Sequence, residues 1–77
     1  MRKDSYTVTA FYFEGELNAW MRKKNMSVHA LAQATGITAR LVYQLANGDH
    51  EVTPELATRL ARALNITMKD LVGDIFS

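Results

Sequence analysis

Residues 27–45 read Ser-Val-His-Ala-Leu-Ala-Gln-Ala-Thr-Gly-Ile-Thr-Ala-Arg-Leu-Val-Tyr-Gln-Leu, and this stretch decides the fold. Ser27 and Thr38 are helix-capping residues, and apolar residues follow each of them at helical spacing. Gly36 lies between the two patterns and can take the positive φ of a tight turn, while the small Ala32 lets the second helix cross closely. The stretch predicts a helix-turn-helix, although on spacing alone a general corner between two helices of a small bundle fits equally well.

Signals for three more helices flank this stretch. An apolar pattern predicts a first helix over residues 16–24, and Thr53-Pro54-Glu55 begins a fourth helix with a cap, a first-position proline and an acid. Thr67, with Asp70 three residues later, begins a last short helix as in a capping box. The residues expected to be buried are Leu17, Trp20 and Met21 in the first helix, Val28, Leu31 and Ala32 in the second, Leu41, Val42 and Leu45 in the third, and Leu56, Leu60, Ala63 and Leu64 in the fourth.

Residues 5–13, Ser-Tyr-Thr-Val-Thr-Ala-Phe-Tyr-Phe, differ from the rest of the chain because they are almost entirely β-branched or aromatic. Such a run favours a β-strand over a helix, and Gly15 follows as a break. The chain offers no second strand of comparable length, so we expect this strand to pair with its copy in a homodimer. The fold class expected is mainly α: a five-helix domain over residues 16–77, preceded in residues 1–15 by an N-terminal β-strand that serves as a dimerisation arm.

The paired strands are expected to bury one face on the helices, either Phe11 and Phe13 or Tyr12. A contact through the last helix, around Leu71, Ile75 and Phe76, is the rival interface. The dimerisation residues expected in the arm are Tyr6, Val8, Ala10, Phe11, Tyr12 and Phe13.

Composition narrows the classes of function. The chain has 77 residues, no cysteine and a formal net charge of +1, so we expect one domain without disulfides or thiolate metal sites. His29 and His50 have no partners at ligand spacing, so no metal and no other cofactor is expected. No Ser-His-Asp set, paired-carboxylate cleft or phosphate loop is visible, so we do not expect an enzyme. No apolar run reaches the roughly 18 residues of a membrane span, and the absence of a secretory signal makes the cytoplasm the expected location.

Leu-Ala-x-x-x-Gly-Ile-Thr at residues 31–38, and Asn47-Gly48 after the third helix, resemble the Xre-type helix-turn-helix domain of phage repressor and Cro proteins. Leu-Ala-x-x-Leu-Ala-x-Ala-Leu-Asn-Ile-Thr at residues 56–67, followed by Asp70-Leu71, continues the similarity, which covers about residues 17–72. The resemblance implies a repressor-like five-helix domain that binds double-stranded operator DNA as a homodimer and regulates transcription as a repressor.

The resemblance also implies which residues contact DNA. The recognition helix is expected over residues 38–46, with its N-terminal part in the major groove. Arg40 and Gln44 lie four residues apart on one face, where arginine can pair with guanine and glutamine with adenine. Tyr43 is expected against sugar-phosphate or a thymine methyl group, and Thr38 and Asn47 against phosphates. The expected DNA-binding residues are Thr38, Ala39, Arg40, Tyr43, Gln44 and Asn47.

Three features depart from the family's pattern. Val28 stands where the family often has a phosphate-binding glutamine, and the loop at residues 48–51 is acidic where relatives are commonly basic. Both changes predict few phosphate contacts and modest affinity, and they keep open an alternative function as a protein-interaction module, such as an antitoxin or anti-regulator. Met21 and Ala46 replace an arginine–glutamate pair that the family frequently buries, and the loss of both partners together leaves no unpaired charge in the core.

Overall fold

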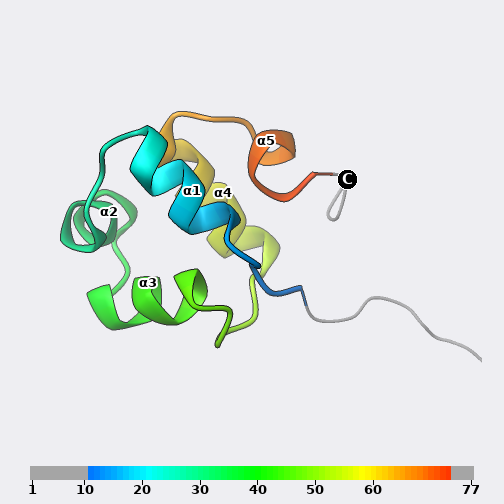
Figure 1. Cartoon of the computed structure of the whole chain (residues 1–77), viewed down its shortest axis with the longest axis horizontal. Helices are drawn as coiled ribbons and strands as arrows, with labels where there is room; N and C mark the ends of the chain where they lie inside the picture. The colour runs from blue at the N-terminus through cyan, green and yellow to red at the C-terminus, as the bar shows by residue number, and fades with distance from the viewer. Residues whose placement is uncertain (1–10, 74–77) are drawn as a thin grey trace, which may run out of the picture.

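The computed structural model describes residues 11–73, which form five short helices around one core (Figure 1). These helices are α1 (Glu16–Lys23), α2 (Val28–Thr35), α3 (Ala39–Ala46), α4 (Pro54–Leu64) and α5 (Met68–Val72). α4 packs against α2 and α5, α1 packs against α3 and α5, and α2 and α3 pack against each other. The predicted five-helix arrangement is confirmed, with Lys24 and Thr38 serving as caps rather than as helical residues.

Each of the four later helices begins at a capping residue that the sequence predicted. The cap hydroxyl accepts a hydrogen bond from a first-turn backbone N–H, at 3.1 Å for Ser27 and Ala30, 3.1 Å for Thr38 and Leu41, and 3.2 Å for Thr53 and Leu56. Thr67 and Asp70 form a reciprocal capping box with hydrogen bonds of 2.9 and 3.2 Å. Because helix starts leave backbone N–H groups without partners, each cap stabilises its helix by roughly 1 kcal/mol.

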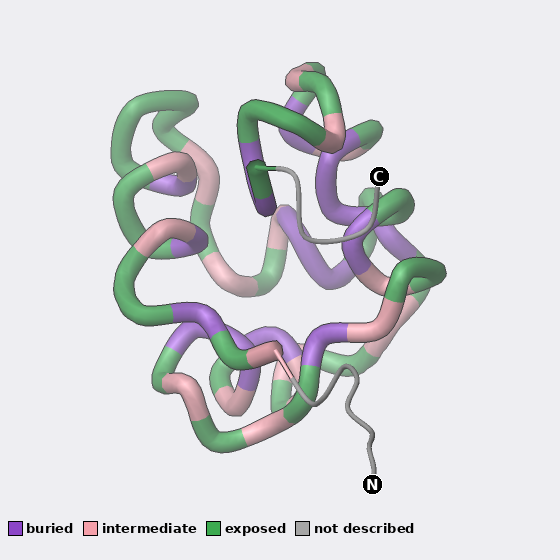
Figure 2. Tube along the Cα trace, turned by 90° about the vertical axis from the view of Figure 1, so that its right-hand side faces the viewer, coloured by how far each residue is buried: buried purple, intermediate pink, exposed green. Residues whose placement is uncertain are grey.

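Every helix contributes at least one leucine to a single core. The largest fully buried side chains are Leu17, Leu31, Leu45, Leu60, Leu64, Leu71, Val42 and Val52. Figure 2 shows buried and exposed stretches alternating along the chain, with buried residues in each helix from α1 to α5. The prediction for α4 was wrong in part, because Leu56 and Ala63 are only half-buried, whereas Ala57 and Ala61 are buried. Small residues on the inner face let α4 lie close to α2 and α5. Trp20, Val28 and Leu41 are also half-buried, at the edge of the core.

The predicted N-terminal β-strand is not supported. Within residues 11–73 there is no strand, and the β-type pairing there is one isolated antiparallel bridge between Phe11 and Val52. In this bridge the Val52 N–H donates to the Phe11 carbonyl oxygen at 2.7 Å. The expectation failed because the loop before α4 in the same chain, rather than a second strand, supplies the partner for this segment. The rest of the predicted strand, including Tyr6, Val8 and Ala10, lies outside the described residues.

Phe13 holds the segment before α1 to the core. Its side chain is 2% exposed, and the Phe11 ring meets it edge-on with the ring centroids 5.7 Å apart. Gly48, at φ 78°, lies so close that a Cβ there would be 2.9 Å from the Phe13 carbonyl oxygen. Tyr12, between the two phenylalanines, is 45% exposed, so the predicted alternation of faces is confirmed for these three residues. Phe13 is therefore used within its own chain, and Tyr12 is the exposed aromatic residue among residues 11–13.

We expect substitutions of the neighbouring residues Phe13 and Tyr12 to differ strongly in their effect on stability. Phe13→Ala should lower the free energy of unfolding by about 3–5 kcal/mol, because it empties a fully enclosed site in a small core. Tyr12→Ala, the matched control, should change it by less than about 1 kcal/mol at a concentration where the protein is monomeric, because the ring is then largely in water. Urea denaturation followed by circular dichroism measures both, and equal losses would contradict the placement of Phe13.

Candidate nucleic-acid interface

α2 and α3 meet at a turn built around Gly36. This residue has φ 80° and ψ 12°, and its N–H donates to the Ala32 carbonyl oxygen at 2.9 Å. Thr35 is buried, and its hydroxyl donates to the Leu31 carbonyl oxygen at 2.7 Å. The Ile37 N–H donates back to the Thr35 hydroxyl oxygen at 3.4 Å. The positive φ predicted for Gly36 is confirmed, and local hydrogen bonds close the turn.

Arg59 of α4 links the end of α2 to the body of the domain. Its Nη1 donates to the Thr35 carbonyl oxygen at 3.2 Å, and its Nη2 lies 3.1 Å from a carboxylate oxygen of Glu55. The Thr35 carbonyl is one of the last in α2, where backbone acceptors have no partner inside the helix. Sequence reasoning gave Arg59 no role. The four-residue spacing from Glu55 signalled a pair within α4, but no pattern in the sequence indicates a contact 24 residues away.

α3 is buried along one face and exposed along the other. Val42, Leu45 and Ala46 lie in the core, and Tyr43 on the opposite face is 56% exposed. The predicted DNA-binding residues all lie on α3 or at its two ends: Thr38, Arg40, Tyr43 and Asn47 are exposed, and Ala39 and Gln44 are half-buried. The structure therefore brings these residues onto one element, with Arg40 more accessible than Gln44.

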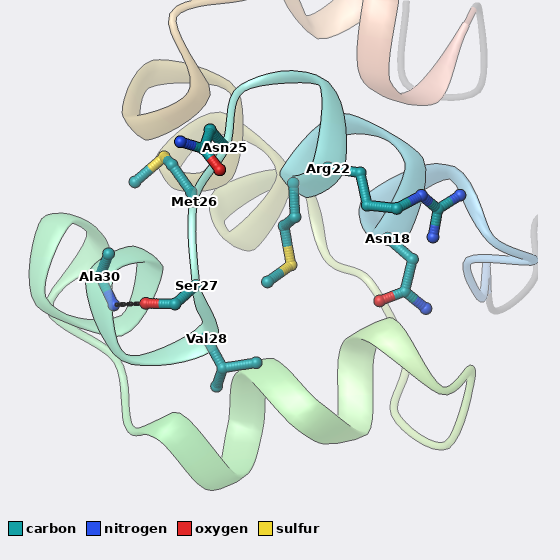
Figure 3. A pocket seen from close by; sticks show the side chains of 8 residues that line it. Asn18, Arg22, Asn25, Met26, Ser27, Val28 and Ala30 are labelled. Carbon is teal, nitrogen blue, oxygen red and sulfur yellow. Dashed lines mark hydrogen bonds between the residues drawn. The ribbon is translucent and has the colours of Figure 1, made fainter.

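A hollow of about 750 Å³ lies between α1 and the start of α2 (Figure 3). The lining residues are Asn18, Met21, Arg22, Asn25, Met26, Ser27, Val28 and Ala30. Met21 is buried, whereas Arg22 is exposed on the same helix. Val28, where the family often has glutamine, points toward α3 and is half-buried. The hollow thus has apolar walls from Met21, Met26 and Val28, with polar groups around them.

The loop after α3 carries exposed carboxylates close to the helix end. Asp49 and Glu51 are exposed, and the Asp49 N–H donates to the Gln44 carbonyl oxygen at 2.8 Å. Nδ1 of His50 lies 2.8 Å from the Glu51 carbonyl oxygen. Because this loop is bonded to the last turn of α3, its negative charge lies at one end of the exposed face.

The family comparison matches residues 16–77 to the Cro/C1-type HTH DNA-binding domain. The chain belongs to this family. α2, the Gly36 turn and α3 are the helix-turn-helix of this Cro/C1-type domain, so the family inferred from residues 31–71 is confirmed. The chain is therefore a DNA-binding domain, and α3 is the second helix of its helix-turn-helix.

Solved structures of regulators share this fold. The restriction-modification controller protein C.AhdI from Aeromonas hydrophila superposes with a TM-score of 0.70 at 27% sequence identity, over 73% of this chain and 85% of that chain. The clp gene regulator ClgR from C. glutamicum superposes with a TM-score of 0.72 at 24% identity, over 75% of this chain and 75% of that chain. A search of curated proteins returned no match. This Cro/C1-type domain thus shares its fold with a controller protein and with a gene regulator.

Residues 11–73 contain neither a cluster of metal-ligating side chains nor a membrane-spanning helix. No group of three or more His, Asp or Glu side chains in this range could hold a metal ion. None of the helices α1 to α5 has both the length and the apolar character that crossing a membrane requires.

Substitutions of Gly36 test the turn. Gly36→Val should lower the melting temperature by several degrees and weaken DNA binding, because a β-branched residue at this φ costs more than the about 1–2 kcal/mol typical of L-residues. Gly36→Asn, the matched control, should cost much less, because asparagine tolerates the left-handed region. Space does not limit either variant, since the nearest atom to a Cβ here, Arg59 Nη1, is 3.7 Å away. A Gly36→Val protein that melts like the wild type would refute the turn geometry.

Proposed function

We propose that this Cro/C1-type domain is a sequence-specific transcriptional repressor that places α3 in the major groove of an operator, and that it is a binding module rather than an enzyme. The observation that carries the proposal is the division of α3 into a buried apolar face and an exposed face carrying Arg40 and Tyr43. A helix held in this way presents its side chains without having to fold during binding, so little ordering cost opposes recognition.

Base reading is assigned to Arg40 and Gln44. Arg40 lies in the first turn of α3 and is exposed, so its guanidinium can pair with both acceptors of a guanine. Gln44 follows one turn later and is half-buried, which supports a shorter reach toward the same groove. Tyr43 offers its ring to a thymine methyl group or to the sugar-phosphate chain. Thr38 and Asn47, at the two ends of α3, would fix the register through phosphates.

Further phosphate contacts would come from the start of α2. Val28 supplies no hydrogen-bond donor in its side chain, but Arg22 lines the same hollow from α1 and is exposed. The exposed Arg22 of α1 and the backbone N–H groups at the start of α2 would each contribute a phosphate contact in place of the absent glutamine. Asp49 and Glu51 lie at the opposite end of the interface and repel the backbone there. Affinity would therefore depend on few phosphates and fall gently with salt.

Repression follows from occupancy. A domain seated in the groove of a promoter excludes other proteins from the same base pairs by its volume alone. This mode of action needs no activating contact, so it suits a domain whose exposed face is directed at DNA. A promoter–reporter fusion carrying the operator should lose expression when the protein is supplied.

Binding of two copies to one operator would compensate for the affinity that each copy lacks because it makes few phosphate contacts. In a two-fold dimer the two α3 helices must lie about 34 Å apart, one turn of DNA. Phe13 is buried in the core of its own chain. A dimer interface formed by the N-terminal arm would therefore use Tyr12 and the residues before Phe11. The rival interface is the last helix, around Leu71 and the residues that follow it.

The second candidate function is binding to a protein partner. The exposed Asp49 and Glu51 beside α3 favour it, because carboxylates at this place would attract a basic protein surface and oppose DNA. The two functions predict different results in a selection from random DNA. A regulator enriches a defined site, whereas a module specialised for protein enriches none.

The base-reading assignment is tested with three alanine variants. Arg40→Ala and Gln44→Ala should each cost about 1–3 kcal/mol on the duplex that the wild-type protein selects, and little on a random duplex. Asn47→Ala, the control for a phosphate contact, should weaken binding to both duplexes alike. Titrations by fluorescence anisotropy give these values. Equal losses on both duplexes for all three variants would mean that no base is read.

The dimer is tested by deleting residues 1–10, which retains Phe13 in the core. The shortened protein should keep its helical circular dichroism, sediment as a monomer and bind a palindromic operator much more weakly than the full chain. Tyr12→Ala in the full chain should weaken the dimer in the same direction. If the shortened protein still sediments as a dimer at micromolar concentration, the interface lies elsewhere, and the last helix becomes the candidate.

A further inference from the structure

The C-terminal end of α3 leaves four backbone carbonyl groups without partners inside the helix. The residues that follow α3 satisfy three of them: the Asn47 N–H donates to Tyr43 at 2.9 Å, the Asp49 N–H to Gln44 at 2.8 Å, and the Gly48 N–H to Leu45 at 3.2 Å. The fourth carbonyl, of Ala46, accepts a hydrogen bond from Nδ2 of Asn18 in α1 at 3.2 Å. A side chain of α1 therefore supplies the last hydrogen bond that the C-terminal end of α3 requires.

This bond differs in kind from the other contacts between α1 and α3. Asn18 and Ala46 are 28 residues apart, and the bond is partly shielded from water. Met21 and Ala46 are both buried in the core, where apolar packing with a flexible methionine tolerates small shifts between helices. A hydrogen bond constrains both distance and angle, so the amide of Asn18 restricts how α3 can slide or tilt against α1.

We propose that Asn18 is a positioning residue for DNA recognition, which sets the pose of α3 by holding the Ala46 carbonyl and does not contact bases itself. The inference rests on the proposed reading of DNA by α3. α3 has eight residues and spans about 12 Å, so a tilt at its C-terminal end moves every side chain on its exposed face. Hydrogen bonds from Arg40 and Gln44 to DNA bases tolerate displacements of these side chains of only about 0.5 Å.

Three variants separate this role from general stabilisation. Asn18→Leu keeps the branched shape of the side chain but removes the donor, and Asn18→Gln keeps an amide donor on a longer side chain. Gln33→Ala, the matched control, removes an exposed amide from α2 that has no hydrogen-bond partner among residues 11–73. Each variant is measured on the duplex that the wild-type protein selects from a random pool and on a random-sequence duplex, over a series of salt concentrations, together with its melting temperature.

Asn18→Leu should lower affinity for the selected duplex about three- to ten-fold, the effect of losing one net hydrogen bond. Its affinity for the random duplex should stay within about two-fold of the wild type, with an unchanged salt slope, because phosphate contacts set both. Asn18→Gln should restore part of the loss, and Gln33→Ala should behave as the wild type.

Other results overturn the proposal in distinguishable ways. Wild-type affinities for Asn18→Leu would show that the bond does not set the pose of α3. Equal losses on both duplexes with a lower melting temperature would assign Asn18 a structural role only, and a shallower salt slope would make it a direct phosphate contact. Failure of the proposed function is seen separately, because the wild-type protein would then select no site or Arg40→Ala would leave the preference unchanged.

Discussion

An eight-residue helix has little stability of its own in water, so α3 exists as a helix because its inner face is buried. Val42 and Leu45 are fully buried. The small side chain of the buried Ala46 lets other parts of the same chain come close to the last turn of α3. The same burial that holds α3 in place leaves Arg40 and Tyr43 outside, since residues at these positions fall on the opposite side of a helix. Stability and the proposed DNA recognition thus use opposite faces of one short helix.

Polar contacts then define how the helices lie on this apolar core. Arg59 of α4 donates to the end of α2, and Asn18 of α1 donates to the end of α3. Both bonds join a side chain of a flanking helix to a backbone carbonyl at a helix C-terminus, where acceptors otherwise lack partners. Apolar packing supplies most of the stability, whereas directional bonds of this kind select one arrangement among several that bury similar area.

The electrostatics of the domain point to recognition by shape and base contacts more than by charge. The chain has a formal net charge of only +1, and Asp49 and Glu51 are exposed beside α3. A binder with few phosphate contacts gains little non-specific affinity, so under the proposed function a larger share of the binding free energy would come from bases and from the pairing of two copies. This balance favours discrimination between sites over tight binding to any DNA.

Local signals in the sequence determined the helices, their caps and the turn. Ser27, Thr38, Thr53 and Thr67 cap helices because a side-chain hydroxyl bonds a backbone N–H three residues on, and Gly36 takes a φ that other residues resist. The motif spacing also predicted the family and the exposure of Arg40 and Tyr43 on α3, whereas Ala39 and Gln44 are half-buried. Only the tertiary structure decided where residues 11–13 lie, although their sequence resembles a strand. Phe11 forms a bridge with Val52, and Phe13 is buried in the core of the same chain. The tertiary structure alone revealed the roles of Arg59 and Asn18, because contacts across 24 and 28 residues depend on which helices pack together. The apolar pattern of each helix shows which face is buried but not which helix covers it.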